Sequence, residues 1–218
     1  MRPLTERWAK PVLPIDGRPV LASLLRELAS AGFEEVTVVT GHLAEQVEAL
    51  VEDGSPFRLR VSTVRQPQAL GSADAVVRAL DAGASPPLLV TAADTVFLRG
   101  DVGRVVATWA GTSAAGALGV RTGRRAEETP VRVENGLVAE FGGASREHAA
   151  APLWILGEEL AEALRSVPGP PFEIAHAVQE AIATGKEVVA LEMGPMRDLT
   201  HPADVVRHNF PYLSSEGE

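Results

Sequence analysis

The segment VLASLLRELASAGFEEVTVVT, residues 20–40, joins one helix pattern directly to one strand pattern. Its apolar residues recur at helical spacing and are Val20, Leu21, Leu24, Leu25 and Leu28. Gly32 follows, as is common just after a helix C-terminus. The β-branched run at residues 36–40 is typical of a strand buried in a parallel sheet. We therefore expect this segment to be a helix–strand unit of an α/β fold.

The same alternation continues along most of the chain. Strand patterns recur at residues 59–64, 88–91, 114–120, 151–156 and 188–192. Helix patterns recur at residues 43–51, 72–80, 101–109, 158–164, 172–184 and 201–209. Strands that alternate with helices predict a mostly parallel sheet that is covered on both faces. The sequence therefore predicts an α/β fold, a Rossmann-like three-layer sandwich with a mostly parallel sheet.

One part of the chain breaks the alternation. Within residues 120–150, runs at 131–133 and 137–141 flank Asn135-Gly136, a strong hairpin signal. We expect a small antiparallel excursion there, with Arg124-Arg125 in a solvated polar turn.

No repeat, low-complexity block or linker interrupts the sequence, so residues 1–218 are predicted to form one domain. The tail at residues 214–218 is expected to be frayed.

Composition excludes several classes of function. A net charge of −9 disfavours binding to nucleic acid, and an anionic ligand would need local cations or a metal ion. The absence of cysteine excludes disulfides, thiolate metal sites and cysteine nucleophiles. No apolar run reaches the roughly 20 residues that a membrane helix needs, and residues 1–15 do not resemble a secretory signal. We expect a cytoplasmic protein with no nucleic-acid or membrane partner; a homo-oligomer is left open.

Two aspartates are candidate metal ligands. In an open parallel sheet, ligands bind beyond the carboxyl ends of the strands, and Asp94 follows the apolar strand at residues 88–91. One or two carboxylates together with substrate phosphates are how Mg²⁺ is usually held. Asp198, just before the last helix, is the second candidate. Either residue could instead form a turn or a cap, with Thr200 as the expected N-cap of that helix.

Two loops could bind the remainder of a ligand. Residues 1–15 form a short basic loop that carries Arg2 and Lys10. In the second loop, Gln66 offers a donor and an acceptor that suit a nucleobase edge, and Gly71 lets a flat ring approach the backbone. The second loop could equally be a plain turn.

Several segments resemble the sugar-phosphate nucleotidyltransferase (NTP-transferase) family, which joins a sugar 1-phosphate to a nucleoside triphosphate and releases pyrophosphate. The matching segments, in family order, are RPLT at 2–5, KPVLPI at 10–15, GRPVL at 17–21, VTVVTG at 36–41, Gln66 with GSA at 71–73, LLVTAAD at 88–94, FEI at 172–174 through GKEV at 185–188, and RDLTHPAD at 197–204. The last one resembles the family's D-I-G-T-P-E-D segment. Together they cover about the whole chain.

The resemblance implies roles for residues on the phosphate side. It implies that Lys10 and Asp94 are catalytic, with Lys10 contacting phosphate, and that Arg2 lies at the end of the triphosphate loop. It also implies that Asp94 and Asp198 hold Mg²⁺. The implied partners are an NTP and a sugar phosphate.

The resemblance also implies a nucleotide-binding loop and a sugar-binding side. It assigns Gln66, Gly71 and Ser72 to the nucleotide base. The acidic contact to the sugar is Glu140 or Glu173, while Trp154 is expected in the core rather than at the ligand.

The beginning of the family pattern has no counterpart here. Family members start with an apolar strand and a G-x-G-T-R loop before the RPLT equivalent, whereas this chain reaches RPLT at residue 2. We expect a natural start further upstream, a non-catalytic relative, or an enzyme with other phosphate donors. The functional alternatives are therefore a non-catalytic nucleotide- or sugar-binding regulatory homologue, and a cytidylyltransferase acting on a non-sugar alcohol phosphate.

Overall fold

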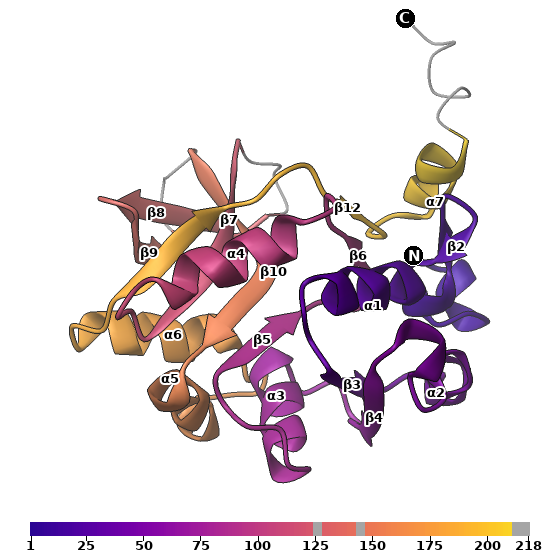
Figure 1. The fold of residues 1–218 in the computed structure, drawn as a ribbon, viewed down its shortest axis with the longest axis horizontal. Coiled ribbons are helices and arrows are strands. Elements are labelled where there is room, and N and C mark those ends of the chain that lie inside the picture. The colour runs from indigo at the N-terminus through magenta and orange to yellow at the C-terminus, as the bar shows by residue number, and fades with distance from the viewer. Residues whose placement is uncertain (124–127, 143–146, 211–218) are drawn as a thin grey trace, which may run out of the picture. The chain divides into compact units, whose positions relative to one another are not determined.

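The computed structural model describes residues 1–123, 128–142 and 147–210 (Figure 1). The turn predicted at Arg124-Arg125 and the tail predicted at 214–218 lie outside these residues. The chain divides into two compact units. The first unit comprises Met1–Pro67, Ala93–Val102 and Pro195–Glu218, and the second comprises Gln68–Ala92 and Gly103–Gly194. The assignment of residues 1–218 to one domain stays a prediction.

The described residues of the first unit form three helices and three short two-stranded sheets. The helices are α1 (Val20–Ser30), α2 (Ala44–Val51) and α7 (Pro202–Asn209). The strand pairs are β1 (Pro14–Ile15) with β2 (Arg18–Pro19), β3 (Glu35–Thr40) with β4 (Arg60–Arg65), and β6 (Thr95–Val96) with β12 (Arg197–Asp198). Three 3₁₀ turns complete the unit: η1 (Leu4–Glu6), η2 (Lys10–Val12) and η3 (Ser55–Phe57).

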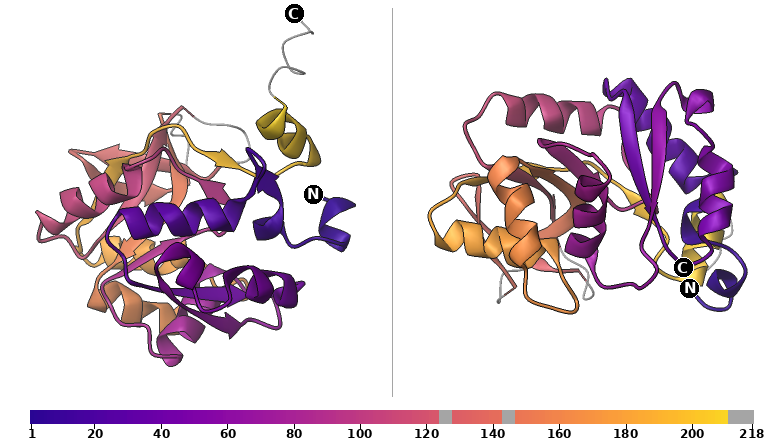
Figure 2. Two further views of the ribbon diagram at one scale, coloured as in Figure 1. Left: turned by 45° about the vertical axis from the view of Figure 1, so that its right-hand side comes forward. Right: turned by 90° about the horizontal axis from the view of Figure 1, so that it is seen from below.

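The helix–strand unit predicted at residues 20–40 is confirmed. The apolar face of α1 is buried, as its spacing requires. β3 pairs with β4 in parallel, in register from Glu35 opposite Arg60 to Thr40 opposite Arg65, and the two strands run side by side in Figure 2. No other described strand pairs with β3, so one of its edges has no backbone partner in a sheet.

A tight hairpin sets the course of the chain after the basic loop. β1 and β2 are joined by Asp16 and Gly17, whose φ angles are 53° and 69°. Two successive positive φ angles define a type I′ turn, whose twist matches that of the flanking strands. The turn was predictable from Asp-Gly, but the two-residue strands were not.

The second unit is built on one six-stranded sheet in the order β5-β10-β7-β11-β9-β8. Its strands are β5 (Leu88–Thr91), β7 (Gly116–Thr122), β8 (Pro130–Glu134), β9 (Leu137–Phe141), β10 (His148–Leu156) and β11 (Val188–Glu192). A further pairing of β10 with β8 closes all of these strands except β5 into a ring. β5 extends the sheet from β10.

The prediction of a mostly parallel sheet is wrong for the described strands. Only β3–β4 and β7–β11 are parallel pairs, and the other pairs are antiparallel. The reason lies in residues 116–156, where the described residues show no helix between β7, β8, β9 and β10. Strands joined by short loops pair antiparallel, because a parallel connection needs a crossover. The predicted antiparallel hairpin of β8 and β9 around Asn135-Gly136 is confirmed, and the three-layer order stays a prediction.

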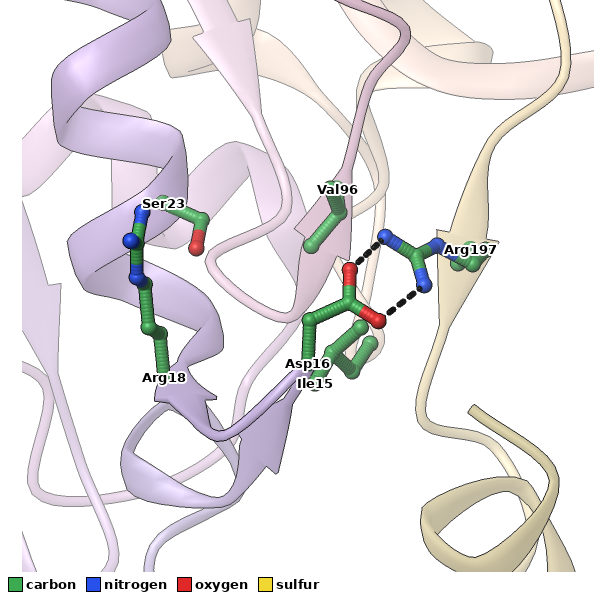
Figure 3. Close-up of a pocket in the computed structure, with 6 residues that line it drawn as sticks. All are labelled: Ile15, Asp16, Arg18, Ser23, Val96 and Arg197. Carbon is green, nitrogen blue, oxygen red and sulfur yellow. Dashed lines mark hydrogen bonds and ion pairs between the residues drawn. The ribbon is translucent and has the colours of Figure 1, made fainter. Parts of the chain in front are cut away.

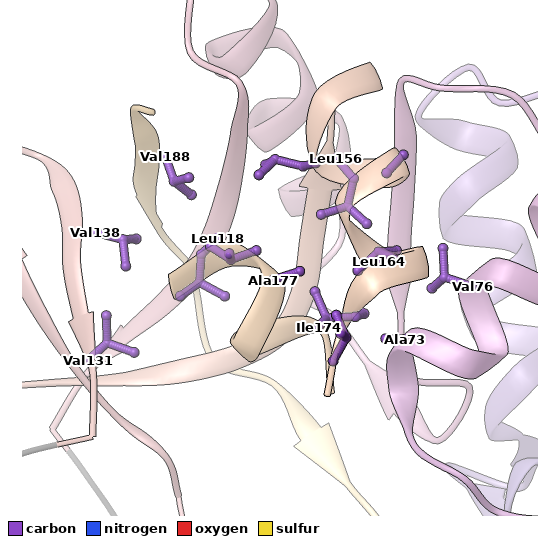
Figure 4. Packing of buried hydrophobic residues seen from close by; sticks show 14 of the residues in the cluster. Ala73, Val76, Leu118, Val131, Val138, Leu156, Leu164, Ile174, Ala177 and Val188 are labelled. Carbon is purple, nitrogen blue, oxygen red and sulfur yellow. The ribbon is translucent and has the colours of Figure 1, made fainter. Parts of the chain in front are cut away.

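The core of the second unit lies between this sheet and its helices (Figure 4). The helices that contribute to this core are α3 (Ser72–Asp81), α5 (Glu158–Ala163) and α6 (Ile174–Ala183), with the turn η4 (Leu164–Ser166) after α5. Helix α4 (Asp101–Ala110) begins in the first unit and continues into the second. Leu118 of β7 is fully buried in this core together with Ala177 of α6, and a buried Leu contributes about 1.5–3 kcal/mol. Trp154 packs against the core, as predicted. Its ring also stacks on Phe141, with ring centroids 5.5 Å apart. The described helices include none long and apolar enough to cross a bilayer.

Candidate active site

The structure brings the two predicted catalytic residues into contact. Lys10 opens η2, and its Nζ donates a hydrogen bond to Oδ2 of Asp94 over 3.0 Å, across 84 positions of sequence. Both side chains remain accessible to ligand, with exposures of 36% and 23%. The basic loop is held from α2 by Gln46, whose Oε1 accepts from the amide of Ala9 and whose Nε2 donates to the carbonyl of Arg7. These two bonds fix the backbone that leads into Lys10.

Asp198 lies on a small ladder that begins directly after Asp94. β12 pairs antiparallel with β6 so that Asp198 stands opposite Thr95, the residue directly after Asp94. Leu199 follows Asp198, is fully buried, and packs with Leu13. A small apolar cluster therefore ties the segment after Lys10 to the segment that carries the second predicted metal ligand.

The cap of α7 differs from the prediction. His201, not Thr200, is the N-cap, because its backbone is extended and helical geometry begins at Pro202. Buried Asp204 accepts hydrogen bonds from the amides of His201 at 2.6 Å and Thr200 at 2.9 Å. Burial raises the pKa of Asp204, but these amides and nearby Arg207 lower it, and the net pKa is below its ordinary value. Asp198 is therefore a strand residue that capping does not explain.

On the side of the β6–β12 ladder opposite to Asp198, Arg197 and Asp16 form an ion pair (Figure 3). Arg197 holds Asp16 through two nitrogens, with Nη1 2.9 Å from Oδ1. The guanidinium lowers the pKa of the Asp16 carboxyl, and the carboxylate raises the pKa of Arg197. The pair borders a cavity of about 320 Å³, which Val96, Arg18 and Ser23 also line. It fastens β12 to the β1–β2 turn.

A second cavity, of about 410 Å³, opens beside Lys10. It is large enough for a small ligand. Thr40 and Gly41, at the carboxyl end of β3, line it together with Trp8, whose side chain is 54% exposed. The backbone of Gln66 lies against this strand end, because its backbone N–H donates a hydrogen bond of 2.7 Å to the carbonyl of Thr40. Arg2 is exposed and is not among the residues that line either cavity.

Gly71 has a structural reason to be glycine. Its φ is +119°, and a Cβ added there would come within 2.2 Å of the backbone oxygen of Phe172. The backbones are held together because Ala73 donates to the carbonyl of Phe172, and Phe172 donates to the carbonyl of Leu70. The close approach predicted for Gly71 is thus made by the chain itself; contact with a base stays a prediction.

Ser72 joins the N-termini of two helices. Its Oγ lies 2.5 Å from Oε2 of Glu173 and accepts a hydrogen bond of 3.0 Å from the amide of Ile174. Ser72 therefore satisfies a free amide at the start of α6 while it holds the Glu173 carboxylate. Of the two acidic candidates for the sugar side, Glu173 is engaged in this contact, and Glu140 pairs with Arg132 at 3.2 Å.

Sequence reasoning missed the β6–β12 ladder and the Asp16–Arg197 pair. The only local signal was the β-branched pair Thr95-Val96 directly after Asp94. Two residues are too few to show the alternation on which strand prediction depends.

The sequence pattern described as the MobA-like NTP transferase domain matches residues 4–189. The chain belongs to the MobA-like NTP transferase family. A glucose-1-phosphate thymidylyltransferase of Streptomyces antibioticus is 27% identical over 98% of this chain and 63% of its own length. One of Streptomyces griseus is 38% identical over 37% of this chain and 23% of its own length. This NTP transferase domain thus spans less than two thirds of these relatives.

Solved structures agree with the family in fold. A UDP-glucose pyrophosphorylase complexed with UDP-glucose matches with a TM-score of 0.81 at 18% identity, over 98% of this chain and 94% of that one. At this identity the match shows the Rossmann-like α/β fold alone. It agrees with the α/β class expected from the alternation of helices and strands.

Proposed function

We propose that this NTP transferase domain belongs to an enzyme that joins an NTP to a sugar or polyol 1-phosphate, giving an NDP-sugar and pyrophosphate. The observation that carries the proposal is the 3.0 Å contact between Lys10 and Asp94, with Asp198 on the ladder that begins after Asp94. An ammonium and two carboxylates drawn from distant segments are a suitable set for charged phosphates. The thymidylyltransferase relatives support the same reaction class.

The chemistry requires two anions to approach each other. A phosphate oxygen of the sugar phosphate forms a bond to the α-phosphorus of the NTP, while the bond from that phosphorus to the β-phosphate oxygen breaks. Pyrophosphate leaves with the bonding electrons, and no protein nucleophile is needed. Lys10 would place its ammonium against a phosphate oxygen and offset the charge of the transition state. The main task of the domain is then to position an in-line displacement.

The donor set suits a magnesium ion. Asp94 and Asp198 offer hard oxygen ligands, and Mg²⁺ typically takes one or two carboxylates and completes its shell with water and substrate phosphates. The described residues contain no cluster of three or more His, Asp or Glu placed for a metal, so an all-protein cage is not offered. When bound, Mg²⁺ supplies positive charge next to the phosphates. Asp94 and Asp198 are the residues that would hold it.

The remaining assignments are parts of the same proposal. We assign Gln66, Gly71 and Ser72 to the nucleotide base and Arg2 to the triphosphate. Gln66 directly follows β4 and lies beside the end of β3, which supports its assignment, because the carboxyl ends of parallel strands are where ligands bind. A cytoplasmic location stays a prediction from the sequence.

Pyrophosphate release is the direct test. The chain is assayed with each NTP in combination with sugar 1-phosphates and with non-sugar alcohol phosphates, with Mg²⁺ present. Titration calorimetry measures NTP binding in parallel. Release with a sugar or polyol phosphate supports the proposal. Binding without release favours the regulatory homologue, and release confined to CTP with a non-sugar alcohol phosphate favours the cytidylyltransferase. A chain that neither binds an NTP nor releases pyrophosphate contradicts the proposal.

A further inference from the structure

Thr95 carries a buried hydroxyl group that the fold does not use. Its side chain is 1% exposed, and its Oγ1 has no hydrogen-bond partner among the described residues. Burying a hydroxyl group without a partner is unfavourable, and most buried polar side chains therefore have one. Valine has the same shape and would avoid the cost. The hydroxyl group of Thr95 thus calls for an explanation other than packing.

The register of β6 and β12 places this hydroxyl group next to Asp198. Thr95 and Asp198 stand directly opposite each other in the antiparallel ladder. Opposite residues of such a ladder project to the same side, with Cβ atoms about 4.5–5.5 Å apart. That distance lets the hydroxyl group of one side chain reach the carboxylate of the other after a change of rotamer.

The Asp16–Arg197 ion pair marks the opposite side of the same ladder. Val96 stands opposite Arg197, and both line the cavity at Asp16. Figure 3 shows Arg197 reaching Asp16 there. Because neighbouring residues of a strand project to opposite sides, Thr95 and Asp198 share the other side. Arg197 and Asp16 hold the ladder, and Thr95 is left beside a carboxylate that the proposed function assigns to a metal.

We propose that Thr95 is a positioning residue for Asp198. When the nucleotide and its metal bind, the Thr95 hydroxyl group donates a hydrogen bond to the Asp198 carboxylate and fixes its orientation. A hydroxyl group that donates to an ionised carboxylate makes a short, strong bond, and carboxylates that hold metals are usually held in turn by such partners. The inference rests on the proposed function, since it assigns Asp198 to the metal. It adds a residue whose role appears only in the ligand-bound state.

Two variants separate this role from a structural one. Thr95→Val keeps the shape and removes the hydroxyl group, and Thr95→Ser keeps the hydroxyl group as the matched control. Thermal melting is measured without metal or nucleotide, and Mg²⁺-dependent NTP binding is measured by calorimetry. We expect Thr95→Val to melt at the same temperature or higher, and to bind Mg²⁺ with NTP roughly tenfold more weakly. Thr95→Ser should bind as the wild type does.

A second pair of variants tests whether the effect passes through Asp198. In an Asp198→Asn background, Thr95→Val should cause no further loss of Mg²⁺-dependent binding. If the Thr95→Val protein binds Mg²⁺ with NTP within twofold of the wild type, the role of Thr95 is overturned and the proposed function is not affected. A Thr95→Val protein that melts well below the wild type points to a structural hydroxyl group and also overturns it. Failure of the wild type itself to bind any NTP with Mg²⁺ overturns the proposed function and this role together.

Discussion

Replacing Gly71 with alanine should destabilise the protein far more than the same change at Gly83. The two glycines have similar positive φ angles, +119° and +106°, so alanine is strained at both. Their surroundings differ. A Cβ at position 71 would lie 2.2 Å from the oxygen and 2.6 Å from the nitrogen of Phe172, whereas a Cβ at position 83 would meet nothing within 4 Å. Gly83 is therefore a matched control for the backbone strain alone.

The difference can be worked out from these contacts. Holding a non-glycine residue in a sparsely populated backbone region costs about 1–3 kcal/mol at either site. At position 71, the overlap with Phe172 adds about 1–3 kcal/mol, as overpacking does. Relief by moving Phe172 would strain its bonds to Leu70 and Ala73, at 2.7 and 2.8 Å, and each contributes about 0.5–1.5 kcal/mol. We expect a loss of about 2–6 kcal/mol for Gly71→Ala, from backbone strain plus either the overlap or its relief, and about 1–3 kcal/mol for Gly83→Ala.

Urea unfolding followed by circular dichroism measures both losses against the wild type. The informative quantity is the difference between the two variants, since it cancels the shared backbone strain. If Gly71→Ala is destabilised no more than Gly83→Ala, the close approach of Phe172 to Gly71 does not exist in the folded protein. The structural account of Gly71 would then fail, and the base-contact interpretation would stand alone.

Three further predictions concern the candidate site and its support. Asp94→Asn should abolish Mg²⁺-dependent pyrophosphate release while the melting temperature stays near the wild-type value, because a half-exposed ion pair contributes only about 0–1 kcal/mol; unchanged turnover would remove Asp94 from the site. Lys10→Ala should lower kcat/KM roughly 10²–10³-fold in the same assay, as loss of a donor to transition-state charge does, and unaltered kinetics would contradict its phosphate contact. Asp204 should make stability pH-dependent: its pKa is lowered in the folded state, so its contribution is present above the unfolded value of about 3.9 and is lost as pH falls below it. The difference in the free energy of unfolding between the wild type and Asp204→Asn should therefore shrink as the pH is lowered from 6 to 3. A difference that stays constant over this range would argue against a lowered pKa of Asp204.

The sequence by itself determined where the longer helices and strands lie. α1 and β3 were predictable because a helix repeats its apolar residues every three to four positions, and a buried β-branched run persists over several residues. The hairpin of β8 and β9 was predictable from Asn-Gly, because only a few residue types tolerate the positive φ angles of such a turn. The order of matching segments also pointed to the family. All of these signals are local in the chain.

Only the tertiary structure decided how those pieces meet. It set the antiparallel directions of the strands in residues 116–156 and paired β6 with β12, a ladder too short to have a periodicity. It placed Lys10 against Asp94, and it placed Thr95, whose hydroxyl group has no partner in the described part of the chain, opposite Asp198. Residues 84 positions apart come together through packing between segments, which no local pattern encodes. The sequence could nominate Lys10, Asp94 and Asp198 one by one, and folding is what makes them neighbours on the loop and the ladder that form the candidate site.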